Sequence, residues 1–443
     1  MSPMLSLSPM QINAINKASR KAVSDIFQKT NDLKNGRWLS LANSYMIDTT
    51  NQIQRDIKAN SVNDADLGSY ISVSAPLHCV DGWTYLSRAV NSLFQGDFNT
   101  ARHLGYYAEL RAAISILATE GIGILGQDHF VIDDKEKCWQ VHGRNGTHKI
   151  IWPVFEYWAQ QPCAAKLLGS IITPYGINLG DWHSVFSSGS TFPAIANMWL
   201  RCWGLDLQQL NTDHETRNEV SYRPFRILST PPIIPIEIST FIREFWKLFS
   251  PSGISKFDEI DRYLLNKSLQ VAHSALKDGR TYEERIGSVI SAIFRDKEES
   301  VLQSYNQFLS SNKNTLVLLE ANSTDASNHP RQVYQLLSRA CLLLRIATGA
   351  NADLILSAGI SNSGFDFWWK KLGLDAGILD PDNETTSPDE LWSDIETSIT
   401  EVGLWETIVR DPSIYKMHTD NHNAKYFWTL SGTERIAMWG LIR

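Results

Sequence analysis

The chain has 443 residues, a length that fits two or three domains of ordinary size. Hydrophobic residues make up 43% of it and charged residues 20%, which is the composition of a globular protein and excludes a disordered or fibrous chain. The 41 basic and 48 acidic residues give a formal net charge of −7, so the chain as a whole does not attract nucleic acid. Only a local basic patch would do so.

Its 15 tryptophans predict a large core or a sizeable partner surface. The five cysteines have no paired spacing and indicate reduced thiols rather than a disulfide framework. Residues 1–21 contain no sustained apolar stretch, so we expect no signal peptide. The most apolar window, residues 340–360, is interrupted by Arg345, Asn351 and Asp353 and is not expected to span a membrane. Together these features predict a cytoplasmic protein.

The first elements in chain order are helices. Residues 10–60 show helical periodicity with many polar positions, which predicts two or three helices. The pattern of residues 78–94 predicts another helix, with Asp81 as its cap.

The stretch from Phe98 to Val131 predicts a long amphipathic helix. Asn99 or Thr100 can cap its start, and Gly121 supplies its end. The short turn at Gly96-Asp97 predicts that this helix packs antiparallel to the preceding one.

The next segment is mixed. Residues 139–152 predict a small hairpin that turns at Asn145-Gly146, and residues 153–172 and 191–210 return to helical patterns. The three prolines within residues 229–235 cannot lie inside a helix and mark the expected domain boundary.

Beyond this boundary the periodicity predicts helices again, at residues 239–249, 257–276, 282–308, 332–348, 390–399 and 431–441. Residues 315–320 suggest a short strand, and residues 380–389 an acidic loop. The prediction is a mainly α protein: a helical bundle flanked by N- and C-terminal helical regions, with at most minor β-hairpin content.

The expected division of the chain has four parts. Residues 1–75 form an N-terminal helical region, and residues 76–230 form a helical domain. Residues 231–250 form a proline-containing linker and helix, and residues 251–443 form a C-terminal helical domain.

Two motifs have the spacing of known ligand sites. Gly121, Gly123 and Gly126 match a dinucleotide loop, but a helix precedes them where that loop requires a strand, so they indicate a helix end and a turn. Cys138 and His142, with His148 nearby, lack the four ligands and paired spacing of structural zinc.

A third motif follows the suggested strand of the C-terminal half. Glu320, Asn322, Asp325 and His329 lack the lysine that a metal-dependent nuclease would need there, which favours a polar loop that caps the next helix. We therefore expect no metal and no cofactor.

Two segments together resemble the HEPN superfamily of helical bundles, over about residues 76–230. The first is the helix after Phe98, with Tyr106-Tyr107 and Arg111-Ala112-Ala113, and the second is Arg217-Asn218-Glu219-Val220-Ser221-Tyr222. The resemblance implies a helical bundle that pairs across a two-fold interface, and a setting in prokaryotic toxin or antiviral defence systems.

Active HEPN ribonucleases carry an arginine, a polar residue and, four to six residues after the arginine, a histidine. Arginine suits a developing phosphorane charge, and a histidine of pKa near ~6.5 suits proton transfer at neutral pH. Arg217-Asn218 matches the first half of this signature, but Tyr222 stands where the histidine is expected. A tyrosine of pKa about 10 is a poor general base at pH 7.

The tyrosine, the acidic net charge and the abundant tryptophans favour a non-catalytic function. The protein would be an assembly or interaction subunit of a prokaryotic anti-phage or toxin-type defence system. It would bind a protein partner, or a second copy of itself, through the HEPN-like domain.

The alternative is a metal-independent endoribonuclease acting on RNA. Arg217 would stabilise the phosphorane, Asn218 would orient the phosphate and Tyr222 would act as the acid. His129 or His214 would replace the missing base, and His214 would share a helical face with Arg217, three residues on.

A nucleic-acid binder without catalysis is the third possibility. It would require a basic patch formed by Lys135, Lys137, Arg144 and Lys149, and binding that falls steeply with salt.

Overall fold

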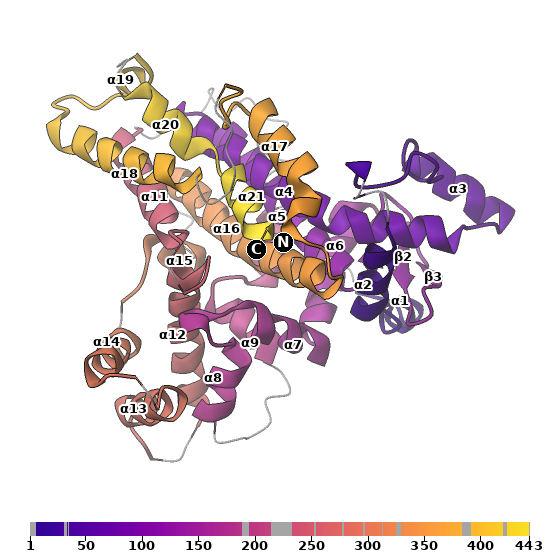
Figure 1. The fold of residues 1–443 in the computed structure, drawn as a ribbon, viewed down its shortest axis with the longest axis horizontal. Coiled ribbons are helices and arrows are strands. Elements are labelled where there is room, and N and C mark those ends of the chain that lie inside the picture. Colours follow the sequence, from indigo (N-terminus) through magenta and orange to yellow (C-terminus); the bar gives the residue numbers. More distant parts are fainter. Residues whose placement is uncertain are drawn as a thin grey trace.

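The computed structural model describes residues 6–30, 33, 35–187, 195–213, 233–251, 254–276, 279–295, 297–311, 313–324, 329–382, 391–419 and 423–442. These residues are mostly helical, with a small three-stranded sheet (Figure 1). The expected mainly α fold with minor β content is confirmed.

The elements before residue 233 are α1 (Pro9–Ile15), α2 (Arg20–Lys29), α3 (Thr49–Ala59), α4 (Asp64–Phe94), α5 (Phe98–Thr119), β1 (Ile122–Gly123), β2 (His129–Ile132), β3 (Cys138–Val141), α6 (Thr147–Ala159), α7 (Pro162–Ile171), η2 (Pro174–Gly176), α8 (Leu179–Phe186), α9 (Ile195–Cys202) and a helical turn at residues 207–213.

The later elements are α11 (Pro235–Leu248), α12 (Asp258–Ala275), α13 (Tyr282–Ile293), α14 (Glu299–Ser310), α15 (Leu316–Ala321), α16 (His329–Ser357), η4 (Asn362–Phe365), α17 (Asp366–Asp375), α18 (Leu391–Ile408), α19 (Ile414–Thr419), α20 (Ala424–Ser431) and α21 (Glu434–Leu441).

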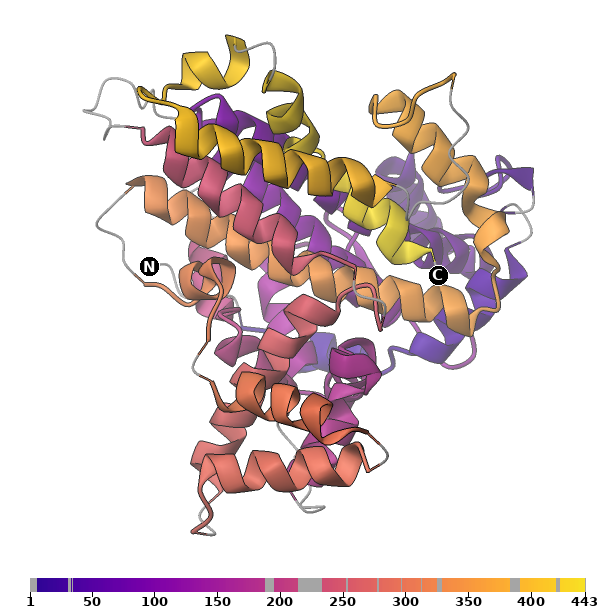
Figure 2. The ribbon, with the colours of Figure 1, turned by 60° about the vertical axis from the view of Figure 1, so that its left-hand side comes forward.

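Three long helices form the centre of the molecule. The helices α4 and α5 pack as the expected antiparallel pair, and α16 lies against both of them (Figure 1). Figure 2 shows that α11 runs roughly parallel to α16 and that α18 packs on α11. Small residues allow this close packing: a Cβ atom on Gly105 of α5 would come within 2.2 Å of Leu336 on α16.

The helix α5 is buried on almost every side, rather than along the single stripe of an amphipathic helix. It lies between α4 and α16, so both of its long faces are covered. Its cap also differs from the prediction. The Asp97 side chain accepts a hydrogen bond from the backbone amide of Thr100 (3.1 Å), so the cap lies before Asn99. The helix ends before Gly121, as expected.

The helix α4 begins 14 residues earlier than residue 78, the expected start (78 − 64 = 14). Asn63 caps it, Pro76 lies in its interior, and Asp81 is a mid-helix residue rather than a cap. The expected domain boundary after residue 75 therefore falls within one continuous helix. The fold thus accommodates a proline inside a helix, where it removes one backbone hydrogen bond.

The sheet is antiparallel in the order β1-β2-β3. The predicted hairpin turn at Asn145-Gly146 is wrong: the hairpin joins β2 to β3 through residues 133–137. Asp133 Oδ1 closes this turn by accepting the amides of Lys135 and Lys137, both at 2.9 Å. Gly146 instead precedes α6.

The strand predicted at residues 315–320 is also wrong, because these residues form α15. The Thr315 hydroxyl caps this helix by accepting the amide of Leu318 (3.2 Å). The helix predicted over residues 282–308 is two helices, α13 and α14, and that predicted over residues 191–210 is interrupted after Cys202.

The hydrophobic core runs through elements from both sides of residues 229–235. Leu117, Trp246 and Leu344, for example, belong to one continuous cluster. Arg20 adds a polar connection, because its guanidinium donates to Glu120 Oε1 (3.2 Å) and to Asp353 Oδ2 (2.9 Å). The described parts of the four predicted regions therefore share their packing.

By length and composition, residues Arg331–Ser357 of α16 form a helix apolar enough to cross a membrane. Of its most apolar stretch, however, 78% is buried within the fold. The stretch therefore lies in the core of the fold.

Replacing Gly121 by Ala is expected to lower the free energy of unfolding by about 1–3 kcal/mol. Gly121 has φ +86°, and a Cβ atom there would come within 3.1 Å of the Ser19 backbone nitrogen and 3.2 Å of the Ile132 oxygen. Urea unfolding measures the loss. The matched control is Gly146→Ala, where φ is −62° and nothing lies within 4 Å of the added atom. Equal effects of the two substitutions would contradict the prediction.

Candidate functional site

The residues predicted to form the HEPN-type site, which are His214, Arg217, Asn218 and Tyr222, lie outside the described residues. Their arrangement stays a prediction.

His129, the other proposed replacement for the missing base, is fully buried in β2. Its Nδ1 accepts the backbone amide of Leu125 (3.1 Å), and its Nε2 lies 2.8 Å from the Asn145 carbonyl oxygen. Both ring nitrogens thus hold backbone in place, and burial lowers the pKa of His129. The imidazole is structural, so the ribonuclease alternative loses this base.

Three buried charged groups lie where α5 and α16 meet the helical turn at residues 207–213. Arg339 of α16 donates from both Nε and Nη2 to Asp213 Oδ2, at 3.0 and 2.7 Å. Glu109 of α5 is fully buried, and its Oε1 lies 3.6 Å from Arg339 Nε without a hydrogen bond. Burial raises the pKa of Glu109 well above its ordinary value, with the Asp213 charge adding to the effect. Arg339 therefore pairs most closely with Asp213, and the buried site of Glu109 favours the protonated form of this carboxyl group.

A group of imidazole and phenol rings lies on the N-terminal part of α5. Tyr106 Oη lies 2.9 Å from His148 Nδ1 of α6, and the Tyr107 ring contacts the rings of His103 (5.1 Å) and His148 (6.0 Å). Tyr85 of α4 also stacks on the Tyr107 ring, with the two ring centroids 5.3 Å apart. His103 and His148 are half-buried, so these imidazoles combine solvent access with fixed positions.

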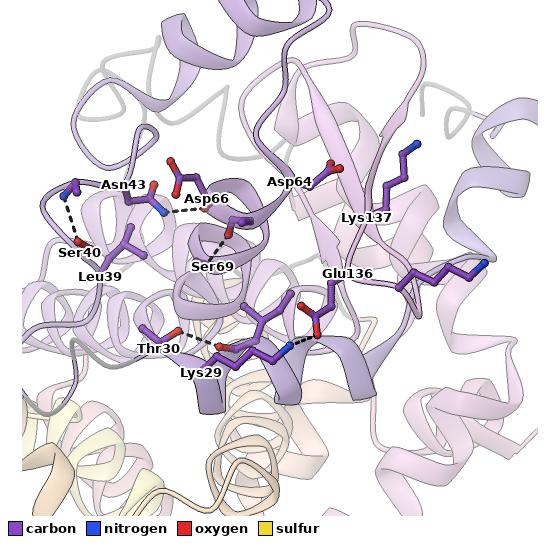
Figure 3. A pocket seen from close by; sticks show the side chains of 14 residues that line it. Lys29, Thr30, Leu39, Ser40, Asn43, Asp64, Asp66, Ser69, Glu136 and Lys137 are labelled. Atoms are coloured by element: carbon purple, nitrogen blue, oxygen red, sulfur yellow. Dashed lines mark hydrogen bonds and ion pairs between the residues drawn. The ribbon is translucent and has the colours of Figure 1, made fainter.

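Figure 3 shows a polar pocket of about 580 Å³ between the end of α2, the start of α4 and the β2–β3 turn. Three of its charged groups already have partners within the protein. Lys29 forms an ion pair with Glu136, Asp66 accepts the Ser44 hydroxyl (2.7 Å), and Asp64 accepts the Cys138 amide (3.0 Å). These internal contacts reduce the number of polar groups that the pocket can offer to a ligand.

The basic patch required for a nucleic-acid binder is partly neutralised. Lys137 lies over the Trp139 ring, next to Glu136, and Arg144 is 3.6 Å from Asp128. Acidic groups thus lie among the basic ones, which weakens this third possibility.

The best-formed site is a groove of about 820 Å³ between the loop at residues 36–46 and α17. Its floor consists of α4 and the Arg111 side chain of α5, and its walls are mostly apolar. Trp38 anchors the loop wall, because its ring packs against Phe367 (5.8 Å) and Trp368 (5.5 Å) at the α17 wall. Leu41, which is 59% exposed, lies at the rim. An apolar cleft with few polar groups is the usual form of a binding pocket.

Three polar side chains meet on the floor of this groove. Arg111 Nη1 donates to His78 Nδ1 (2.8 Å) and lies 3.7 Å from Asp81 Oδ2. A guanidinium can only donate, so His78 Nδ1 is the accepting nitrogen and the ring proton is on Nε2. Burial and the neighbouring Arg111 charge lower the pKa of His78 to about 3.

The low pKa decides what this histidine can do. A general base is effective when its pKa lies near the working pH, and His78 remains neutral far below that range. Arg111 and His78 are therefore suited to recognition by hydrogen bonding rather than to proton transfer.

Sequence reasoning missed the pairing of His78 with Arg111. The two residues are 33 positions apart, but they lie at similar distances from the turn at Gly96, and an antiparallel helix pair brings such positions together. The α17 wall of the groove was also missed, because the sequence analysis predicted no helix at residues 366–375.

Among the described residues, no group of three or more His, Cys, Asp or Glu side chains is arranged to hold a metal ion. Comparison of the chain with protein-family models, with curated proteins and with solved structures finds no match.

Proposed function

We propose that this chain is a HEPN-like, non-catalytic interaction subunit of a prokaryotic anti-phage or toxin-type defence system. It acts by binding a protein partner, or a second copy of itself, through the HEPN-like domain. We propose that this contact includes the groove between the loop at residues 36–46 and α17, whose floor contains His78 and Arg111 of the HEPN-like region. The observation that carries the proposal is this groove, whose apolar walls enclose an arginine and a neutral histidine. The defence setting comes from the HEPN resemblance of residues 76–230.

Exposed apolar side chains next to the groove support a protein-binding function. Leu41 is 59% exposed and Met46 38% exposed, both in the loop that forms one wall, and Ile47, the residue after this loop, is 90% exposed. Contiguous exposed apolar surface rimmed by polar residues is typical of protein interaction sites.

The decisive experiment is incubation of the purified protein with labelled RNA in EDTA. We expect no cleavage above that of the Arg217→Ala variant, because the tyrosine in place of the histidine leaves the arginine without a base. Metal-free cleavage by the unaltered protein that is lost in Arg217→Ala would overturn the proposal.

One observation favours the second candidate function, the metal-independent endoribonuclease. His103 and His148 flank the Tyr107 ring on α5, within the region that resembles HEPN. If the same RNA assay shows cleavage, a loss of about 100-fold or more in His148→Ala would identify this imidazole as the missing acid or base. The matched control is His142→Ala, an exposed histidine just before α6.

A further inference from the structure

The polar floor of the groove determines which chemical groups can bind there beside apolar ones. Its polar floor offers hydrogen-bond donors from Arg111, because only Nη1 of this guanidinium is used within the described residues, toward His78. The nearest carboxylate, Asp81, lies at 3.7 Å and is 52% exposed, so it does not occupy the remaining donors.

The neighbouring histidine reinforces this preference. Since His78 Nδ1 accepts from Arg111, the only ring nitrogen that carries a proton is Nε2, which makes the imidazole a second donor. A group bound beside these two side chains must accept hydrogen bonds.

The charge around the groove points the same way. The lining residues include three basic side chains, Arg37, Arg111 and Lys371, and two acidic ones, Asp81 and Asp375, so the local formal charge is 3 − 2 = +1. Lys371 and Asp375 neutralise each other at 2.7 Å. The whole chain has a net charge of −7, so this groove differs in sign from the protein around it.

We propose that the groove selects a segment of a partner protein in which an acidic side chain lies between apolar residues. The carboxylate binds the remaining donors of Arg111, and the flanking apolar side chains pack against the apolar lining of the groove, which includes Leu41, Val73 and Leu77. A guanidinium and a carboxylate form charge-assisted hydrogen bonds, which are stronger than neutral ones. This inference rests on the proposed function, because it names the kind of partner that the same groove takes.

The test uses two acetylated, amidated and dye-labelled peptides of sequence Leu-Leu-Trp-Xaa-Leu-Leu, with Glu or Gln at Xaa. Fluorescence anisotropy with the full chain measures both affinities. We expect the Glu peptide to bind about 10-fold or more tightly than the Gln peptide, which is the effect of one hydrogen bond to a charged group.

Two variants assign the preference to the floor of the groove. Arg111→Gln is expected to reduce the Glu-over-Gln ratio to about one, whereas the matched control Arg295→Gln, at an exposed arginine after α13, leaves it unchanged. Asp81→Asn removes the competing carboxylate and is expected to raise the affinity for the Glu peptide about threefold or more. A gain in affinity cannot result from misfolding.

The outcomes separate this inference from the proposed function. Equal affinities of the two peptides, both weakened by Leu41→Asp, would overturn the acidic preference and leave a purely apolar protein-binding groove. Absence of measurable binding of either peptide at millimolar concentration would also overturn the inference. The proposed function fails on a different result, the metal-free cleavage of RNA that depends on Arg217.

Discussion

Replacement of Asp261 by Ala is expected to lower the free energy of unfolding by about 3–5 kcal/mol, because it leaves a buried guanidinium without a counter-charge. Arg345 of α16 is 1% exposed, and Asp261 of α12 is fully buried. Their two hydrogen bonds are 3.0 and 2.7 Å long, and Arg345 also donates to the Ile171 carbonyl oxygen at 2.8 Å. The pair thus holds α12, α16 and the end of α7 together.

Urea unfolding followed by tryptophan fluorescence measures this effect. The control is Asp375→Ala, which removes an exposed partner of Lys371 and should cost about 0–1 kcal/mol. The double variant Arg345→Met with Asp261→Leu should recover much of the stability, since it removes both charges at once. A loss below about 1 kcal/mol in Asp261→Ala would show that the buried pair does not hold these helices.

Glu109 and Asp213 are expected to respond in opposite ways, although both carboxylates lie beside Arg339. Asp213→Ala removes the partner of the ion pair and should cost about 3–5 kcal/mol. Glu109→Gln should instead be tolerated at low pH and should stabilise the protein at neutral pH. Glutamine has nearly the same shape and cannot ionise in a site that disfavours the charged form.

The pH dependence follows from the raised pKa of Glu109. The native state keeps this proton at pH values where the unfolded chain, with a pKa of 4.5, has lost it. The stabilisation is fully present below about pH 4.5 and is lost as the pH rises through the raised pKa of the folded state. One proton corresponds to at most about 1.4 kcal/mol per pH unit.

Unfolding curves of the unaltered protein and of Glu109→Gln between pH 4 and pH 8 test this prediction. The stability difference should grow with pH in favour of Glu109→Gln. The matched control Glu299→Gln, at an exposed glutamate of α14, should show no such growth. Parallel pH profiles for the parent and Glu109→Gln would contradict a neutral Glu109.

Most helices could be predicted from the sequence because their signals are local. Gly121 ends α5 and the Gly96-Asp97 turn pairs α5 with α4, as expected. The errors arose where packing outweighed these signals. The helix α4 begins at Asp64 rather than at residue 78, and Thr315 caps a helix at the apolar run expected to be a strand.

The candidate groove could not be predicted, because no single segment contains it. Its floor joins His78 and Arg111 from two helices, and its walls join Trp38 to α17. The buried ion pairs of α16 could not be predicted for the same reason. Arg339 and Arg345 bind carboxylates that come from distant segments of the chain, namely Asp213 and Asp261.

By itself the sequence determined the mainly α character, the antiparallel pairing of the helices around Gly96, and the presence of Tyr222 at the position where the HEPN resemblance predicts a histidine. These depend on residues close together in the chain. Only the tertiary structure decided that His129 is held by backbone groups, that burial raises the pKa of Glu109 and that Arg111 has donors to offer in an apolar groove. The physical reason is that charge state and hydrogen-bond availability depend on burial and on partners, and these come from distant segments that meet only in the folded protein.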